Sequence, residues 1–284
     1  MFELYQLEQL VIFAKCGTLS KAAEHLHLSQ PALSRSMQKL EDELRVTIFE
    51  RHKNKIELNQ NGLLAVEYAE KVLDQSRNMA EQLRAFDRSR HTISVGSCAP
   101  APLWEVAPLL SDLYSDMTIS SEMKEKDCLL QGLQDGSYQI ILLPEPLEAP
   151  DLYCTKYGEE HLFFSLPPAH ALSGSKSLYF KDLDGENMLL RSKIGFWHDI
   201  HVKKMPAAHF FVQEENFAFN ELVKISALPS FTSDLVIKRE GKTPNRIIIP
   251  ILDQEANVTY YCLCKKNDMK KLGAFFRRIE QERK

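Results

Sequence analysis

The 284-residue sequence lacks any long apolar run, and nowhere does one approach the roughly eighteen successive residues needed to cross a bilayer. Glu3, Glu8 and Lys15 interrupt the apolar stretch that an N-terminal signal peptide would need. Six cysteines are scattered without a Cys-x-x-Cys pair, which suits free thiols in a reducing compartment better than a disulfide framework. We therefore expect a cytoplasmic protein without a membrane span.

Glycine is scarce, at eleven residues, and motifs of catalysis are missing. The sequence contains no Gly-x-Ser-x-Gly elbow, no glycine-rich phosphate loop and no paired-carboxylate motif. These absences argue against an enzyme, and we expect no cofactor.

Two local patterns invite other interpretations. His198-Asp199-Ile200-His201, with His209 beyond, lacks a third ligand at a recognisable spacing, so we expect solvated or hydrogen-bonded histidines, with a metal sensor as the alternative. Cys262 and Cys264 face one side of an expected strand, where disulfide geometry is rarely met. We expect small core residues there, with a redox switch as the alternative.

Positive charge is not in excess. The net charge is -4, and Lys plus Arg and Asp plus Glu number thirteen each within residues 1–90. Any nucleic-acid site must therefore be confined to a few side chains. The composition, with 44% hydrophobic and 26% charged residues, is that of a globular protein long enough for two domains.

The first thirty residues show the spacing of two short helices. Apolar residues recur at intervals of three and four over 5–16, and Gly17 follows as a stop signal. A second helix is expected to begin near Ser20, whose hydroxyl would cap the free amides that follow, and to end around 25–27.

A third helix is expected to begin after Ser29, its cap, and to continue to about Leu44, with a proline in the first turn where no backbone donor is needed. The face away from its apolar stripe carries short polar or forked groups, which can bond to base edges and phosphates in a DNA major groove. With the second helix included, the residues assigned to DNA contact are Ser20, Ser29, Gln30, Pro31, Ser34, Arg35 and Gln38.

Two short extended runs follow, joined by a tip that contains the turn-forming Asn54. Positive charges at this tip would neutralise phosphates, giving affinity that is independent of base sequence and falls as salt rises. The residues assigned to this role are Arg51, Lys53 and Lys55. The pattern predicts a winged helix-turn-helix over residues 2–59; a small helical bundle with a solvated turn is the alternative.

The stretch from Gly17 to Arg35, followed by Leu40-Glu41 and Phe49-Glu50-Arg51, closely resembles the LysR-type transcriptional regulators over a long ungapped run. This resemblance implies a recognition helix and a wing at the positions just assigned. The sequence departs from the family at the wing, where Lys53 replaces a frequent glycine and Glu57 replaces a frequent basic residue. These departures concern the wing contacts and leave the expected fold unchanged.

A proline-free segment, residues 60–90, is predicted to form a linker and dimerisation helix with a polar hinge. Small and apolar residues repeat there at alternating spacings of four and three, as in a heptad seam. About 27 residues at about 1.5 Å each extend about 40 Å, too far for a small head to cover, so we expect a second copy as partner. The seam is assigned to Ala65, Ala69, Val72, Met79, Leu83 and Phe86. Packing on the chain's own second domain is the alternative.

The remaining two thirds alternate between strand and helix patterns, which predicts parallel strands in two α/β lobes. Strands are expected at 93–96, 117–123, 140–143, 162–166, 208–212, 247–251 and 258–264, and helices at 103–114, 127–133, 217–225 and 269–282. We assign residues 91–284 to this domain, with lobe I at about 91–160 plus 265–284 and lobe II at about 161–264.

This half resembles the effector-binding part of LysR-type regulators, itself similar to periplasmic solute-binding proteins. A ligand should lie beyond the carboxyl ends of the strands. Ser97 is the best single candidate, because its hydroxyl and the next amides could bind a carboxylate at a helix N-terminus; a plain helix cap is the alternative. The residues assigned to the pocket are Ser97, Cys98, Ala99, Leu143, Phe196, Trp197, Phe231 and Thr232.

Together these patterns favour a LysR-type regulator, dimeric or tetrameric, that binds double-stranded DNA and a small-molecule effector, with an anion as one candidate. The rival class is a ligand- or redox-sensing binding protein whose N-terminal head serves oligomerisation. The polar face of the third helix and Arg51 argue against that rival.

Overall fold

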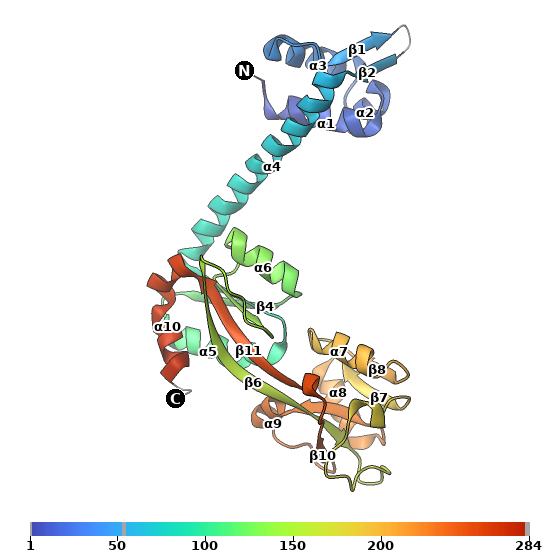
Figure 1. The fold of residues 1–284 in the computed structure, drawn as a ribbon, viewed down its shortest axis with the longest axis vertical. Coiled ribbons are helices and arrows are strands. Elements are labelled where there is room, and N and C mark those ends of the chain that lie inside the picture. The colour runs from blue at the N-terminus through green and yellow to red at the C-terminus, as the bar shows by residue number, and fades with distance from the viewer. Residues whose placement is uncertain (1, 53–54, 282–284) are drawn as a thin grey trace. The chain divides into compact units, whose positions relative to one another are not determined.

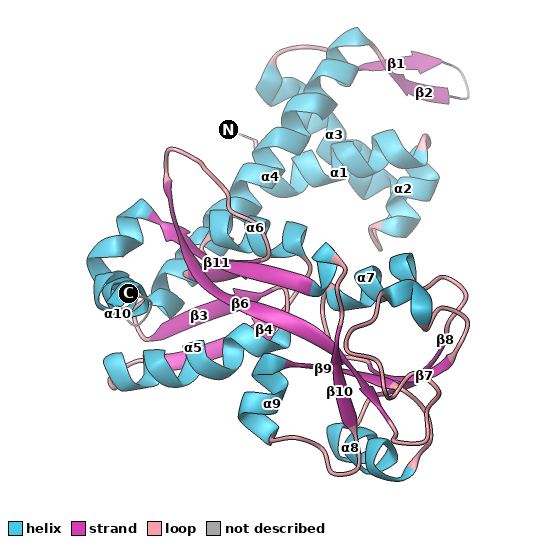
Figure 2. Cartoon of the chain, turned by 60° about the horizontal axis from the view of Figure 1, so that its bottom comes forward, coloured by secondary structure: helices cyan, strands magenta, loops and turns pink. Residues whose placement is uncertain are grey.

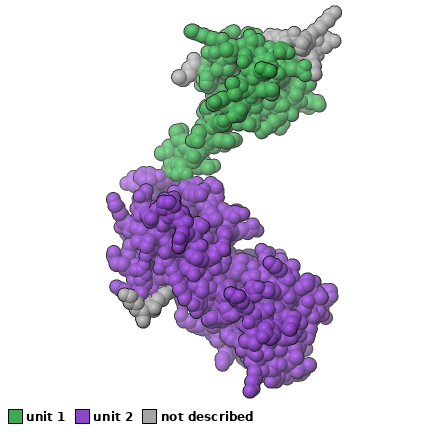
Figure 3. Space-filling view, in the orientation of Figure 1, with its two compact units in different colours: residues 1–84 green, residues 85–284 purple. Residues whose placement is uncertain are grey.

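The computed structural model describes residues 2–52 and 55–281, without the side chains of residues 51, 52 and 55. The chain divides into two compact units, residues 1–84 and 85–284 (Figure 3). Each unit has a hydrophobic core of its own, and each is described by itself.

The first unit is a winged helix-turn-helix that continues into a long helix (Figure 1). Its elements are α1 (Leu4–Cys16), α2 (Leu19–His25), α3 (Gln30–Leu44), β1 (Phe49–His52), β2 (Lys55–Leu58) and α4 (Gln60–Ser89), whose last five residues belong to the second unit. The two strands pair antiparallel, and Gly17 ends α1 in the left-handed conformation, with φ 72°. The predicted helical head with a two-stranded wing is confirmed.

Hydrogen bonds at the helix ends explain where α2 and α3 begin. Ser29 caps α3 as predicted, and its hydroxyl accepts from the backbone N–H of Ala32 at 3.3 Å. The predicted cap of the second helix was wrong. Thr18 accepts from the N–H of Lys21 at 3.4 Å, whereas Ser20 already lies inside α2. Thr18 takes this role because its backbone is extended, as a cap requires.

A buried carboxylate joins α3 to the wing. Glu41 is 7% exposed, and its Oε1 accepts from the backbone N–H groups of Ile48 and Phe49 at 2.8 and 3.1 Å. The Phe49 ring meets Phe13 of α1 edge to face, with the centroids 5.2 Å apart. Glu41 therefore fixes the start of β1 on the helical core.

The first half of α4 packs on the head. Ala69 is 2% exposed and Leu73 is also buried in the core of the head, while Ala65 packs against that core. The predicted seam was therefore wrong at Ala69, because the head already covers that side chain, and Ala65 is partly covered by the head as well. Larger apolar side chains of the seam are 41–68% exposed, namely Val72, Met79, Leu83 and Phe86.

The second unit is the expected two-lobed α/β body (Figure 2). Its strands are β3 (Thr92–Ser97), β4 (Thr118–Met123), β5 (Ile140–Leu143), β6 (Leu152–Leu166), β7 (Asn187–Arg191), β8 (His209–Gln213), β9 (Ser230–Ser233), β10 (Ile247–Pro250) and β11 (Asn257–Lys265). Its helices are α5 (Pro100–Leu113), α6 (Lys126–Asp135), α7 (Trp197–Lys204), α8 (Asn216–Ile225), α9 (Asp234–Glu240) and α10 (Met269–Gln281), with short 3-10 turns at Phe180–Asp182, Gln254–Ala256 and Lys266–Asp268.

The strands form one mixed sheet in the order β4-β3-β5-β11-β6-β9-β7-β8, with β10 also paired to β6. Strands β3, β4 and β5 are mutually parallel in lobe I, as are β7, β8 and β9 in lobe II. The long strands β6 and β11 pair antiparallel and connect the lobes (Figure 1). The predicted parallel sheet is thus confirmed only within each lobe.

Several elements of the second unit had no clear sequence signal. They are the first ten residues of β6 and the whole of β7, α7, β9 and α9. Charged residues interrupt the apolar alternation of β6, and the other four elements are between four and eight residues long. Segments this short cannot be assigned from periodicity alone.

We predict that Glu41→Ala lowers the free energy of unfolding of residues 1–84 by about 2 kcal/mol, because two buried backbone donors lose their acceptor. Glu24→Ala removes a carboxylate from the exposed side of α2 and should change it by less than about 0.5 kcal/mol. Urea unfolding of the full chain, with hydrogen exchange at the Ile48 and Phe49 amides, measures both. Equal losses in the two variants would contradict the assigned role.

Candidate functional site

The N-terminal half of α3 presents a polar face to solvent. Gln30, Pro31, Arg35 and Gln38 are exposed, and Ser34 is half-buried on the same helix. The opposite face is apolar and lies in the head core. The assigned recognition helix therefore has one face free for contact.

A hydrogen bond between α2 and α3 orients one of these polar groups. The Ser20 hydroxyl donates to Gln30 Oε1 at 3.1 Å. Farther along α3, Gln38 Nε2 donates to Asp42 at 3.4 Å. Ser20 thus lies beside the face to which the sequence assigned it.

The wing assigned to phosphate contact is only partly among the described residues. Arg51 and Lys55 lie on the paired strands β1 and β2, and the His52 and Lys55 positions face each other in the ladder. The side chains of Arg51 and Lys55, and the whole of Lys53, fall outside the described residues. Their assignment to phosphate contact stays a prediction.

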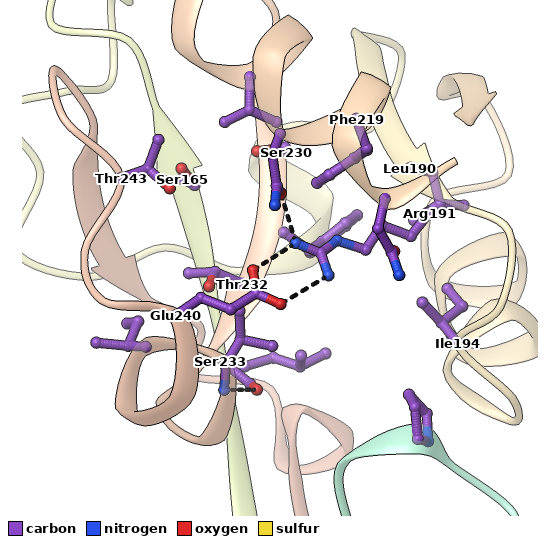
Figure 4. A pocket seen from close by; sticks show the side chains of 18 of the residues that line it. Ser165, Leu190, Arg191, Ile194, Phe219, Ser230, Thr232, Ser233, Glu240 and Thr243 are labelled. Carbon is purple, nitrogen blue, oxygen red and sulfur yellow. Dashed lines mark hydrogen bonds and ion pairs between the residues drawn. The ribbon is translucent and has the colours of Figure 1, made fainter. Parts of the chain in front are cut away.

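A cavity of about 300 Å³ opens in the second unit, mainly within lobe II (Figure 4). Strands β6, β7 and β9 and helices α7, α8 and α9 contribute to its wall, and Pro100 and Trp104 of α5 border it from lobe I. Apolar side chains such as Leu189, Phe219 and Val223 make up much of the lining. This composition is typical of a small-molecule site.

An arginine inside the cavity is already paired. Arg191 NH2 donates to Glu240 at 3.0 Å and to Asn220 at 2.7 Å, and NH1 donates to the second Glu240 oxygen at 3.4 Å (Figure 4). Its guanidinium lies 4.7 Å from the centre of the Phe219 ring. The positive charge is therefore neutralised by Glu240 and held in place.

A buried acid lies at the junction of the lobes and borders the cavity. Glu160 Oε2, on β6, accepts from Trp197 Nε1 at 3.2 Å and from the Tyr260 hydroxyl at 2.5 Å. Burial raises the pKa of Glu160, although hydrogen bonds from Ser233, Tyr260 and Trp197 partly oppose that shift. These bonds tie β6, β11 and α7 together.

A second titratable group in the wall makes no hydrogen bond. His201 on α7 is 2% exposed, and neither ring nitrogen has a partner. Its ring stacks on Phe231, with the centroids 3.9 Å apart and an angle of 12° between the planes. Burial, with a smaller effect from neighbouring His198, lowers the pKa of His201 to about 3, so the imidazole is neutral at pH 7.

The structure brings only some of the predicted pocket residues to this cavity. Trp197, Phe231 and Thr232 line it, whereas Phe196 stacks on Trp197 outside it. The other predicted pocket residues are buried in lobe I and are not among those that line the cavity: Ser97, Cys98, Ala99 and Leu143. Arg191, Glu240 and His201 were missed, because single polar residues so far apart in the chain carry no common pattern.

The groups expected to bind a ligand carboxylate near Ser97 are occupied by protein. The Ser97 hydroxyl donates to the Ala99 carbonyl at 2.7 Å and accepts from the Ala99 N–H at 3.3 Å. The N–H of Cys98 donates to the carbonyl of Leu142. The prediction of free amides there was therefore wrong, and Ser97 is not the cap of α5 either, since the cap residue is Ala99.

A loop of lobe II covers this position. The N–H of Phe196 donates to the Cys98 carbonyl at 3.1 Å. Gly195 has φ 62°, and a Cβ there would lie 1.9 Å from the Cys98 carbonyl oxygen. Only glycine permits so close an approach.

The structure also describes the other two patterns singled out in the sequence. Among the residues that the structure describes, no group of three or more His, Cys, Asp or Glu could hold a metal ion. His201 departs from expectation, since it is neither solvated nor hydrogen-bonded. Cys262 and Cys264 are fully buried, and burial raises the pKa of Cys264 to about 12, which disfavours the reactive thiolate.

No helix within residues 2–52 and 55–281 combines the length and the apolar character that a membrane span requires.

Two family profiles match the chain. One, described as a bacterial regulatory helix-turn-helix protein of the lysR family, covers residues 4–63, and the other, described as a LysR substrate binding domain, covers residues 87–283. Among curated proteins, the RuBisCO operon transcriptional regulator of Allochromatium vinosum is 26% identical over 193 residues, which are 66% of this chain and 64% of that protein. The DNA-binding transcriptional dual regulator OxyR of Escherichia coli K12 is 27% identical over 188 residues, 65% of this chain and 62% of that protein.

A solved structure of comparable length shares the fold. Full-length BenM superposes with a TM-score of 0.51 at 20% sequence identity, over 99% of this chain and 96% of that one. The aligned segments of the two curated relatives span less than two thirds of their length.

The neutral, buried His201 predicts a stability that falls in acid. The unfolded chain takes up the proton near pH 6.5 and the folded chain only near pH 3, so unfolding becomes easier as the pH drops below about 6.5. Between pH 7 and pH 5, we expect the free energy of unfolding of His201→Phe to fall by about 2 kcal/mol less than that of the parent. Urea unfolding followed by tryptophan fluorescence measures this, with His209→Phe, an exposed histidine on β8, as the control. Equal pH dependence in all three proteins would refute the assignment.

Proposed function

Since the chain belongs to the LysR family of bacterial regulatory helix-turn-helix proteins, we propose that it is a sequence-specific DNA-binding transcription regulator controlled by a small-molecule effector. The observation that carries this proposal is the exposed polar face of α3, capped by Ser29 and held to the wing by Glu41. The protein is then no enzyme, and it works in the cytoplasm, where its DNA is.

On this proposal, α3 enters the major groove and the wing follows the phosphate backbone. The amide of Gln30, whose oxygen accepts from Ser20, and the fork of Arg35 are groups that pair with base edges. Thirteen positive and thirteen negative side chains over residues 1–90 leave no broad basic surface. Affinity must therefore come from a few contacts at α3 and at the wing, assigned to Arg51, Lys53 and Lys55.

We also propose that the chain works as a dimer through the second half of α4. Met79, Leu83 and Phe86 are spaced by four and three residues, and they are 62%, 63% and 68% exposed. So much apolar surface on one helical stripe fits a coiled-coil partner. A dimer carries two recognition helices, which predicts an operator with two half-sites.

The effector is proposed to act from the cavity between β6, β7 and β9. Elements of both lobes border it, since Trp104 comes from lobe I and Trp197 from lobe II. A ligand there can favour one arrangement of the lobes over another, which is the thermodynamic requirement for control.

For the DNA contact, we predict that Gln30→Ala relaxes base preference at one position of each half-site by about 1–3 kcal/mol. Lys53→Ala should instead weaken binding to all sequences and lower the salt slope by about one. Gel shifts on a selected operator and its single-base variants, at several salt concentrations, separate the two effects. Lys224→Ala, which removes a lysine of α8, is the charge control. If Gln30→Ala leaves the base preference unchanged, the assignment of α3 as the recognition helix is wrong.

For the dimer, we predict that Leu83→Asp shifts the chain to monomer, because a carboxylate on the stripe would have to be buried in the interface. Gln82→Asp places the same carboxylate on the neighbouring exposed position and should leave the dimer intact. Sedimentation equilibrium measures both. A parent protein that is monomeric at micromolar concentration, or identical behaviour of the two variants, would contradict the seam.

A further inference from the structure

Among the described residues that line the lobe II cavity, Arg191, Glu240 and Glu160 are already engaged by protein groups, and this limits what the cavity can hold. Arg191 is paired with Glu240 at 3.0 Å and with Asn220 at 2.7 Å. The other cations of the lining, Lys193 and Arg239, are exposed to water. An anion in the cavity would have to compete with Glu240 for the guanidinium, and separating a partly buried pair is unfavourable.

The second acid of the lining is equally engaged. Glu160 receives hydrogen bonds from Trp197 and Tyr260, and burial raises its pKa, which disfavours the ionised form that would attract a cation. A cation would have to displace those donors to reach it. Neither sign of charge thus finds an open partner in the interior of the cavity.

One polar side chain of the lining does have open hydrogen-bonding capacity. His201 is buried, its two ring nitrogens are without partners, and its ring is held flat against Phe231. A buried polar group without a partner is unfavourable by about 1–3 kcal/mol, and such groups are rare unless something else satisfies them. A neutral imidazole offers one donor and one acceptor, which match a hydroxyl or a carbonyl group.

The rest of the wall favours a ring. Phe219 and Phe231 line the cavity, and so do both of the chain's tryptophans, Trp104 and Trp197. A volume of about 300 Å³ accommodates a compound of one or two rings.

We propose that this cavity binds an uncharged ring compound whose hydroxyl or carbonyl group hydrogen-bonds to His201. The proposal rests on the proposed function, because it names the chemistry of the effector. It replaces the anion considered from the sequence, since the amides expected near Ser97 are occupied by protein groups and Arg191 by Glu240. His201 then determines which ring compounds are bound.

Three probes of similar size test the proposal on the full chain: benzyl alcohol, ethylbenzene and benzoate. Because both tryptophans line the cavity, their fluorescence reports occupancy directly. We expect both neutral probes to bind at millimolar concentration and benzoate to bind at least about ten-fold more weakly than the alcohol. The variant His201→Phe keeps an aromatic ring against Phe231 but loses the hydrogen bond. The dissociation constant of benzyl alcohol, divided by that of ethylbenzene, should therefore rise about five-fold in this variant. His209→Phe should leave that ratio unchanged.

A second measurement does not depend on a variant. In protein labelled with ¹⁵N-histidine, benzyl alcohol should shift the resonances of the His201 ring nitrogens, and ethylbenzene should leave them in place. Benzoate binding as tight as the alcohol, a ratio unaffected by His201→Phe, or failure of both neutral probes to bind would overturn the proposal.

These readouts need no DNA and therefore separate the two proposals. If the chain binds the neutral probes but gives no gel shift with DNA, the proposed ligand class stands and the proposed regulator function fails. If it gives a gel shift with DNA but binds none of the neutral probes, the regulator function stands and the proposed ligand class fails.

Discussion

The antiparallel ladder between β6 and β11 is the constraint on which the second unit depends. Its register runs from Leu152 opposite Lys265 to His161 opposite Asn257, with one irregularity at Tyr260 and Tyr261. Beyond this ladder β6 pairs with β9 and β10, and β11 pairs with β5. Two strands therefore belong to both lobes, and one hydrophobic core extends through them. Any ligand that acts on the lobes must act across this ladder.

Burial of Glu160 on that ladder explains much of the surrounding geometry. A buried carboxyl is tolerated when donors surround it, and Trp197 and Tyr260 supply two. Fixing Trp197 in turn fixes the start of α7, and with it His201 one turn later. The loop before α7 then closes on the Cys98 carbonyl through Gly195. The open space consequently lies mainly on the lobe II side, with Pro100 and Trp104 of lobe I at its border.

The head is organised by local signals that operate within short distances along the chain. The caps at Thr18 and Ser29 each act over three residues, and Glu41 reaches the wing only seven and eight residues later. Such contacts close only short loops, so they depend on residues that are near in the chain. The sequence therefore predicts the head closely. In the second unit the decisive contacts join residues far apart, such as Arg191 with Glu240 or Glu160 with Tyr260.

By itself, the sequence determined the helical head, the polar face of its third helix, the long helix and the two α/β lobes, because periodicity and caps are local properties. Only the tertiary structure decided that Ala69 lies in the head core and that Ser97 is enclosed. It also decided that Arg191, His201 and Glu160 share one cavity. These outcomes depend on which helices and strands pack against each other, and the order of residues in the chain does not show that packing. The physical reason is that burial and hydrogen-bond saturation are properties of the packed chain, whereas propensity belongs to the residue.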